Sequence, residues 1–281
     1  ISGGGRCNFT NIGAGPANSL SANPHFAKSA LARYTARDFL DLVERHGIAW
    51  HEKTLGQLFC DGSAKQIVAM LLAECEKGAV EVRTGQEIGG VAHDGESFAV
   101  EANGETHRAP ALVIATGGPS IPKMGATGIA YDLARQFGLK VVEPRPALVP
   151  LTLGGEDVLF RELSGVSAPV EAHAGKGKNT GRFREAALLT HKGLSGPAIL
   201  QASSYWRHGE VLRIDFLPDT PRGWLVERKS ATPQATLAQV LRTLLPERLA
   251  DTLAGRLGLD GPLQGAPDKA LTAAEERLHG W

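Results

Sequence analysis

The apolar run Ala111-Leu112-Val113-Ile114-Ala115, which ends at Thr116-Gly117-Gly118, is the feature that most constrains the fold. A continuous apolar run of this length is typical of a strand that is buried on both faces. The glycine turn would stop this strand, and a helical pattern follows over 129–137. A buried strand, a glycine turn and a helix are the units of an α/β sheet, in which ligands bind at the carboxyl ends of strands. The sequence therefore predicts an α/β fold with a ligand near residues 116–118.

The segment before this run has the period of strands. Asp94-Gly95 and Asn103-Gly104 are residue pairs that favour hairpin turns between strands. We therefore expect an antiparallel meander, with strands over 80–83, 87–92, 98–101 and 106–108. Nearer the N-terminus, helices are predicted where cap residues precede apolar positions at helical spacing. These helices are expected over 24–34, from the Thr35 cap to Gly47, and from Ser63 to Gly78, with short strands over 49–53 and 57–60.

The pattern changes after Glu143-Pro144-Arg145-Pro146. Beyond this proline pair, strands are predicted over 148–153, 166–172, 183–190 and 211–217. A helix is predicted over 195–206. From residue 221 onward the chain is predicted to be mostly helical, and the clearest helices are those over 237–245 and 246–257. We place a domain boundary near residue 146. Residues 1–146 would form one domain, and residues 147–281 a second domain that is first β and then helical.

The opening residues form a second glycine-rich segment. Gly3, Gly4 and Gly5 permit positive φ and let the backbone approach a ligand that any Cβ would exclude. The cation Arg6 follows, and then the short polar side chains Asn8, Thr10 and Asn11. This combination suits a planar cofactor that bears phosphate, and an ordinary glycine-rich turn is the alternative. Ile1-Ser2 has the character of a strand end and there is no initial methionine, so we expect a piece of a longer protein.

Charge and cysteine content exclude several classes of partner. The 30 Lys and Arg residues equal the 30 Asp and Glu residues, so bulk charge gives no reason to expect a nucleic acid or an anionic membrane as partner. The three cysteines form no C-x-x-C pair, which favours a reducing cytoplasm. No apolar run approaches the ~18 residues that a membrane span needs. The histidines have no ligand spacing, so no metal is expected.

Two short motifs resemble known ligand sites but lack required residues. Gly13-Ala14-Gly15-Pro16-Ala17-Asn18 has Asn18 in place of the third glycine of a dinucleotide fingerprint, and the polar segment before it does not resemble a strand. We interpret it as a surface loop. His51-Glu52 lacks the second histidine of a zinc-protease motif because position 55 is leucine. Cys60 is interpreted as a buried strand cysteine rather than a redox thiol, and Lys176-Gly177-Lys178 as an exposed hairpin tip.

Gly193-Leu194-Ser195-Gly196-Pro197 resembles a nucleophile elbow except at its last position. His191 could serve as the base for Ser195, so a serine hydrolase is kept as an alternative function. The favoured interpretation makes Ser195 the N-cap of a helix that has Pro197 in its first turn.

The order of the motifs carries a family resemblance. Residues 1–11, Asn23-Pro24, 56–59, 115–118, 163–167 and 190–197 together resemble the BaiN-like NAD(P)/FAD-dependent oxidoreductases, which include aminoacetone-oxidase-like flavoproteins. The resemblance implies a partial FAD-binding Rossmann-like domain, interrupted by an inserted mixed β and helical domain on the substrate side. It implies an FAD-dependent oxidoreductase that acts on a small molecule, with NAD(P)H or oxygen as redox partner, and it nominates no catalytic residue. A flavin-binding module without catalysis is the other alternative.

The resemblance also assigns the cofactor site. The residues expected along the FAD pyrophosphate and flavin are Gly3, Gly4, Gly5, Arg6, Cys7, Asn8, Thr10 and Asn11, with a second contact at Thr116, Gly117 and Gly118. Gly4→Val should then weaken FAD binding. The family's first strand–turn–helix unit and its closing C-terminal segment would lie outside residues 1–281, so we expect residues 1–281 alone to hold FAD weakly or not at all.

Overall fold

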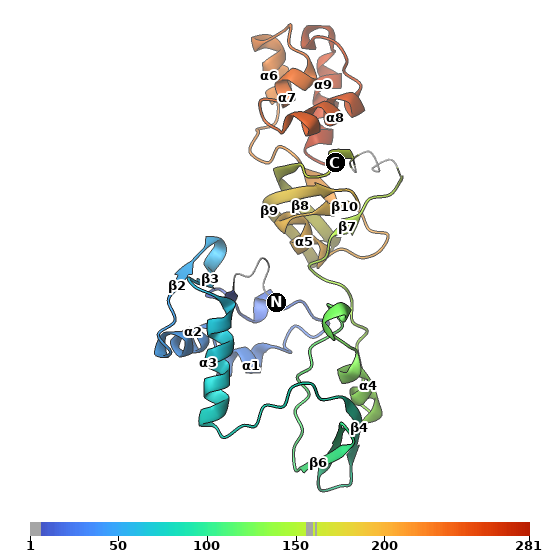
Figure 1. Cartoon of the computed structure of the whole chain (residues 1–281). Coiled ribbons are helices and arrows are strands. Elements are labelled where there is room, and N and C mark those ends of the chain that lie inside the picture. The colour runs from blue at the N-terminus through green and yellow to red at the C-terminus, as the bar shows by residue number, and fades with distance from the viewer. Residues whose placement is uncertain (1–6, 156–159, 161) are drawn as a thin grey trace. The chain divides into compact units, whose positions relative to one another are not determined.

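The computed structural model describes residues 7–155, 160 and 162–281, and the chain divides into two compact units, residues 1–139 and 140–281 (Figure 1). The first unit begins with a three-stranded antiparallel sheet in the order β1-β3-β2. Its strands are β1 (Asn8–Asn11), β2 (Trp50–Glu52) and β3 (Gln57–Cys60). Residues 8–11 therefore form a strand, where the sequence had indicated only a polar loop. This sheet and two helices enclose a small core that includes Val43, Cys60 and Met70.

The helices described in the first unit are α1 (Lys28–Arg33), α2 (Ala36–Arg45), α3 (Ala64–Lys77) and α4 (Ile129–Gln136). Helices α2 and α3 begin at the predicted caps, whereas α1 begins at Lys28 and not at Pro24. At α2 the Asp38 amide donates to Thr35 Oγ1 over 3.2 Å, and Asp38 Oδ2 accepts from the Thr35 amide over 2.7 Å. This reciprocal pair satisfies backbone donors that the first helical turn leaves free. The capping box at Thr35 and the Ser63 cap of α3 are confirmed.

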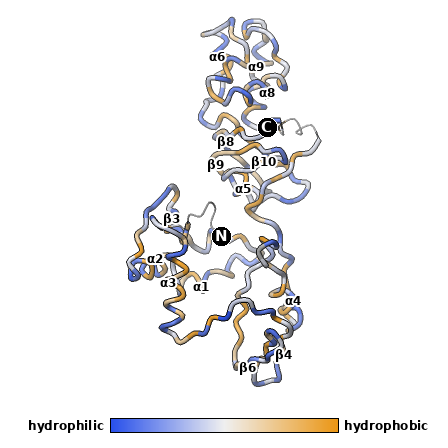
Figure 2. The backbone as a smooth tube through the Cα atoms, in the orientation of Figure 1, coloured by the Kyte–Doolittle hydropathy of each residue, from blue (hydrophilic) through white to orange (hydrophobic). Residues whose placement is uncertain are grey.

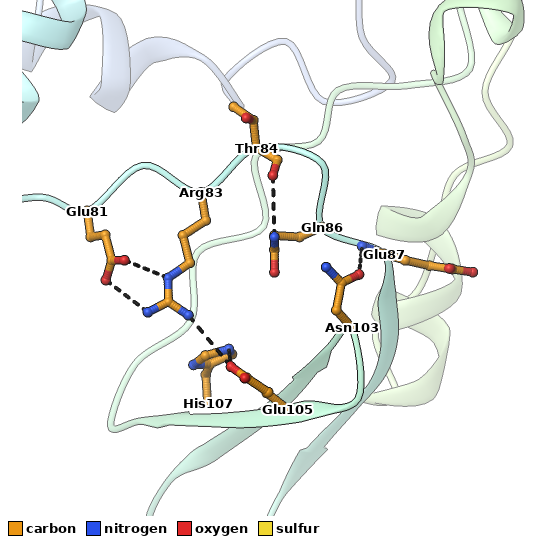
Figure 3. A network of polar contacts seen from close by, with 8 residues as sticks. All are labelled: Glu81, Arg83, Thr84, Gln86, Glu87, Asn103, Glu105 and His107. Carbon is orange, nitrogen blue, oxygen red and sulfur yellow. Dashed lines mark hydrogen bonds and ion pairs between the residues drawn. The ribbon is translucent and has the colours of Figure 1, made fainter.

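The predicted meander is present. It comprises β4 (Ile88–His93), β5 (Phe98–Ala102) and β6 (Glu105–Ala109), paired antiparallel in that order. Asn103 at φ 49° and Gly104 at φ 80° form the turn between β5 and β6. The Asn103 side chain also accepts from the Glu87 amide over 2.8 Å, which attaches the segment before β4 to this turn (Figure 3).

The chain before the meander runs as an irregular segment rather than as the predicted strand over 80–83. Arg83 donates through Nε and Nη2 to the Glu81 carboxylate, over 2.8 and 3.1 Å, and its Nη1 lies 4.0 Å from Glu105 (Figure 3). Gln86 donates to the Thr84 carbonyl over 3.3 Å. These contacts are side-chain contacts at the surface, and the backbone of 80–83 pairs with no described strand. The prediction of a strand there is wrong.

The predicted buried strand over 111–115 is also not formed. Val113 is 84% exposed and Ile114 is 42% exposed. Figure 2 shows the hydrophobic stretch of chain that leads away from β6. Because no described strand lies beside it, this segment has no hydrogen-bonding partner with which to form a sheet, despite its apolar composition.

The second unit contains a five-stranded antiparallel sheet in the order β11-β8-β9-β10-β7. The strands are β7 (Leu151–Thr152), β8 (Ser167–Lys176), β9 (Asn179–Thr190), β10 (Gly193–Ser195) and β11 (Arg213–Asp215). Strands β8 and β9 form a long hairpin, joined by the two-residue turn Gly177-Lys178. Alternate residues of β8 are buried, from Ala168 to Ala174, so the hairpin has an inner apolar face and an outer polar face.

Helix α5 (Pro197–Ser203) packs against β8 and β9 of this sheet. The C-terminal part of the unit is helical and comprises α6 (Trp224–Ala231), α7 (Leu237–Leu241), α8 (Glu247–Leu257) and α9 (Asp268–Leu278). Glu275 is buried, and its carboxylate accepts from the Gly223 amide over 2.5 Å and the Leu225 amide over 3.2 Å. A carboxylate in this position accepts hydrogen bonds from free amides at the start of α6. Its negative charge also interacts favourably with the positive end of the helix dipole.

Candidate functional site

Strand β1 carries the described part of the predicted cofactor loop, and Gly3, Gly4, Gly5 and Arg6 lie outside the described residues. Asn11 Nδ2 donates to the Leu55 carbonyl over 2.8 Å, and Asn11 Oδ1 accepts from the Gly13 amide over 2.8 Å. With its amide nitrogen turned toward the sheet, Asn8 donates to the carbonyls of Thr10 and Leu58. Asn8 and Asn11 therefore hold the loop in shape, while Thr10 stays half-buried on the edge strand of the sheet.

Cys7 faces Cys60 across the β1–β3 pair, where the Cys60 amide donates to the Cys7 carbonyl over 3.2 Å. Cys60 is buried, as predicted, and Cys7 is half-buried. Burial raises the pKa of the Cys60 thiol to about 11, and the neighbouring Cys7 adds to this rise. A thiol must ionise before it acts as a nucleophile, so Cys60 is a poor candidate for redox chemistry near neutral pH.

We expect the rate at which iodoacetamide alkylates Cys60 in the folded protein to keep rising with pH up to about 11, whereas the rate for an ordinary thiol levels off near 9.0. Because folding raises this pKa, the protonated thiol stabilises the folded state fully below pH 9.0, and this contribution is lost as the pH rises to about 11. Peptide mass spectrometry measures how the alkylation rate of Cys60 depends on pH in the folded and in the urea-unfolded protein. The same pH dependence in both states would contradict the burial of Cys60.

The second predicted contact, Thr116-Gly117-Gly118, lies in an exposed turn. Gly117 has φ 69°, a backbone conformation that favours glycine, and a Cβ built on it would meet no described atom within 4 Å. Gly118 instead lies against Tyr131 of α4, whose hydroxyl would be 2.8 Å from such a Cβ. The turn therefore needs a glycine at 117 for conformation and a small residue at 118 for packing, and it leaves open space above Gly117.

The Gly13–Asn18 segment does not form a phosphate-binding loop. A strand does precede it, but β1 is antiparallel to its neighbour, and only a three-residue 3₁₀ helix, Pro16–Asn18, follows. The dinucleotide fingerprint requires a helix long enough to direct its N-terminus at the pyrophosphate. The Gly15 amide is used locally and donates to Asn18 Oδ1 over 3.0 Å.

We therefore expect Gly13→Ala and Gly15→Ala to leave the flavin content of the whole protein unchanged within about twofold. A Cβ at Gly15 would have its nearest described neighbour at 3.8 Å, an ordinary contact, and one at Gly13 would lie 3.3 Å from Asn11 Oδ1, so the Asn11 side chain has to shift by a few tenths of an ångström. The ratio of bound flavin to protein after purification is the measurement. Loss of flavin from both folded variants would show that these glycines line the cofactor.

Ser195 and His191 do not form a nucleophile–base pair in the structure. Ser195 is the last residue of β10 and pairs with Leu188, whereas His191 lies in the exposed turn beyond the Gly193–Thr190 pair. From Gly193 to Ser195 the extended strand rises by ~7 Å, and the turn that holds His191 lies beyond Gly193. The described residues include no hydrogen bond between them. Ser195 is also not the helix cap that the sequence predicted, because Gly196 occupies the N-cap of α5.

The glycines of this motif are explained by close backbone packing. Gly193 has φ 150°, and a Cβ there would overlap the Leu151 carbonyl oxygen of β7. Gly196 has φ 88°, and a Cβ would lie 2.7 Å from both the Ala186 carbonyl oxygen and the Leu188 amide nitrogen of β9. The motif therefore packs β10 and the start of α5 against the neighbouring strands, which is a structural role that the sequence pattern alone did not reveal.

The second unit also contains a cavity of about 1050 Å³ that no sequence pattern predicted. Leu151 of β7 and Ile214 of β11 line it, so it lies between the two outer strands of the sheet. Its polar side chains include Arg145, Arg207 and Arg277, and its apolar wall includes Trp281. The backbone of Trp281 exchanges two hydrogen bonds of 2.9 Å with Ile214.

In the part of the chain that the structure describes, no three His, Cys, Asp or Glu residues are grouped so that they could hold a metal ion. His51, from the discarded zinc motif, lies 2.6 Å from Asp61. None of the described helices has the length and apolar content that a membrane crossing requires.

Family models match both units. Residues 1–201 match the model described as the HI0933-like protein Rossmann domain, and residues 145–281 match the HI0933-like protein barrel and H2TH domain. The chain belongs to the HI0933-like family. The predicted fold class is confirmed: the family model describes residues 1–201 as a Rossmann domain, and the structure contains the antiparallel meander and a second unit of sheet and helices. The family supports an FAD-binding, oxidoreductase-type fold.

Three curated relatives refine this placement. The chain is 52% identical over 257 residues to the ribosomal RNA dihydrouridine synthase of Escherichia coli K12, and 44% identical over 256 residues to that of Haemophilus influenzae. These matches cover 90% and 89% of the chain but 63% of each relative. The 3-dehydro-bile acid delta(4,6)-reductase of Clostridium scindens is 26% identical over 97% of the chain and 68% of its own length. The expected BaiN-like placement is therefore confirmed only at the level of the wider family.

The expectation of no nucleic-acid partner is wrong, because two relatives are named for action on ribosomal RNA. The net charge of the whole chain does not show how charge is distributed along it. Residues 163–213 contain seven Lys and Arg against three Asp and Glu, and an excess of acidic residues elsewhere balances this local surplus. A phosphate group interacts mainly with the protein charges that lie within about one Debye length, ~8–10 Å, of the binding surface.

Proposed function

We propose that the whole protein is a flavin-dependent reductase that converts a uridine of ribosomal RNA to dihydrouridine. The observation that carries this proposal is the 52% identity to a protein of that name across 90% of the chain. The chain spans 63% of that relative. The activity is therefore proposed for the whole protein.

The chemistry is consistent with the other relative. Dihydrouridine differs from uridine by two hydrogens across the C5–C6 double bond, which is conjugated with a carbonyl group. The C. scindens relative is named as a delta(4,6)-reductase, which also describes reduction of carbon–carbon double bonds. A hydride added at C6 and a proton added at C5 balance the reaction, with NAD(P)H oxidised to NAD(P)⁺. Oxygen, the other redox partner considered from the sequence, cannot supply these electrons.

The described residues fit a flavin at the predicted loops. FAD, when bound, would carry the electron pair between the nicotinamide and the uracil ring. The β1 edge presents the half-buried Thr10 hydroxyl, and the exposed Gly117 turn leaves room for a planar group. We propose that Gly3, Gly4, Gly5 and Arg6 contact the pyrophosphate, that Cys7, Asn8, Thr10 and Asn11 shape the ring side of the loop, and that Thr116, Gly117 and Gly118 form the second contact.

The test uses the whole protein and ribosomal RNA from cells that lack its gene. With NADPH, we expect a uridine whose mass has increased by two hydrogens, detected by mass spectrometry of nuclease digests, and no change without the nicotinamide. A flavin-loaded protein that oxidises NADPH but never modifies the RNA would refute the proposal. Reduction of a conjugated steroid ketone by the same protein, with the RNA unchanged, would instead support the small-molecule activity that the distant relative's name describes.

A further inference from the structure

We propose that the outer face and tip of the β8–β9 hairpin form the surface that binds the phosphate backbone of the RNA. We call this the hairpin surface. It consists of the basic residues of the hairpin and of the adjacent strand β11: His173, Lys176, Lys178, Arg182, Arg184 and Arg213. This inference rests on the proposed function, because that function supplies a polyanion as substrate. It goes further by assigning the binding to one face of the second unit.

Strand register gathers these charges on one face. His173 of β8 pairs with Arg182 of β9 on one side and with Arg213 of β11 on the other. Residues directly opposite one another in antiparallel strands place their side chains on the same face. The inner face at this level carries the buried Ala172 and Ile214. The three basic side chains therefore form a row across three adjacent strands on the outer face.

The hairpin tip extends this row. Between Glu171 and Glu185 the sequence has four cations and no acidic residue. Gly177 has φ 60° in the two-residue turn, and a Cβ on Gly175 would overlap the Asn179 carbonyl oxygen, so the tight turn requires glycine at both positions. This turn places Lys176 and Lys178 side by side at the end of a long hairpin, where Lys178 is exposed and the Lys176 side chain is 78% exposed.

The ion pairs on this surface leave its cations available. Lys176 lies 3.9 Å from Glu210, Arg182 lies 3.5 Å from Glu171, and Arg184 contacts Asp219. The Arg184–Asp219 pair is exposed on both sides and contributes only ~0–1 kcal/mol, and the other two contacts are long, so an RNA phosphate can replace these carboxylates at little cost. Among the residues that the structure describes, Lys178 and Arg213 have no ion-pair partner. The acidic residues Glu171 and Asp215 also lie on this face, opposite each other beyond the row, whereas the tip carries cations alone and suits the negative charge of a nucleic-acid backbone.

The test measures binding of protein-free ribosomal RNA to the whole protein at several salt concentrations. Each phosphate contact contributes ~0.7–0.9 to the slope of log K against log salt concentration, so Lys176→Gln with Lys178→Gln should lower the slope by ~1–2. We expect affinity to fall at least about fivefold for this pair, as for the loss of about 1 kcal/mol. Lys65→Gln with Lys269→Gln removes two exposed cations elsewhere and should leave the slope unchanged.

The outcomes separate this proposal from the proposed function. A hairpin double variant that binds RNA with the wild-type slope would overturn the hairpin surface, even if the wild-type protein forms dihydrouridine. A wild-type protein that forms no dihydrouridine, yet binds RNA through these lysines, would overturn the function and leave the surface. Binding to anionic lipid vesicles that depends on the lysines, while RNA binding does not, would also overturn the proposal. Urea unfolding followed by tryptophan fluorescence, unchanged in the hairpin variant, verifies that the fold of the second unit is intact.

Discussion

Gly196→Ala is expected to lower the free energy of unfolding of the second unit by about 3–4 kcal/mol, because strain and overlap add at this position. Gly196 has φ 88°, where an L side chain is strained, and the added Cβ would lie 2.7 Å from two backbone atoms of β9. Backbone atoms of a central strand cannot move away without breaking the β9–β10 ladder. The substitution should therefore separate α5 from the sheet.

The matched control for this prediction is Gly209→Ala. Gly209 has φ 83°, close to that of Gly196, but a Cβ there would meet no described atom within 4 Å. It should cost only the conformational strain of about 1 kcal/mol. Urea unfolding followed by tryptophan fluorescence reports on the second unit, because three of the four tryptophans lie in residues 140–281. Equal destabilisation by the two variants would show that the close packing at Gly196 contributes nothing.

Gly117→Val is expected to lower the flavin content of the whole protein at least about tenfold, the equivalent of ~1.4 kcal/mol of binding free energy. The open space above the turn is where the proposed site places the cofactor, and a branched side chain would occupy it while also straining the φ of 69°. The absorbance ratio of bound flavin to protein after purification is the measurement. Gly4→Val is the corresponding variant at the first glycine loop.

Gly85→Val serves as the control for Gly117→Val. Gly85 has φ 70° and also has no described atom within 4 Å of an added Cβ. The two glycines are therefore matched in φ and in open space, and only Gly117 belongs to the proposed cofactor site. If both valine variants keep the flavin, the proposed contact at Gly117 is wrong. If both lose it, backbone strain rather than contact with the cofactor explains the loss.

The sequence predicted local structure best where a few neighbouring residues determine it. The Thr35–Asp38 cap, the Ser63 cap and the Asn103-Gly104 turn each depend on residues within one helical turn or one hairpin, and all three are present. The same holds for the family, since the motifs that indicated an FAD-type fold were short and in order. Cys60 was also correctly placed in the interior.

The predictions that failed depended on partners distant in the sequence. Residues 111–115 have the composition of a buried strand, but a strand forms only where another strand offers its backbone, and none of those described does so. Ser195 has the chemistry of a cap or a nucleophile, yet its pairing with Leu188 makes it the end of a strand. Net charge likewise hid the local basic excess over residues 163–213, because an average carries no information about position.

The central claim is that electrons pass from a flavin held by this protein to a uridine of ribosomal RNA. The most direct measurement is a single turnover without oxygen, in which the flavin of the whole protein is first reduced by a limiting amount of NADPH. Unmodified ribosomal RNA is then added, and the yellow absorbance of oxidised flavin is followed. The account predicts that this absorbance returns, with one dihydrouridine formed for each flavin oxidised. A flavin that stays reduced, or is reoxidised with no dihydrouridine in the RNA, would contradict it.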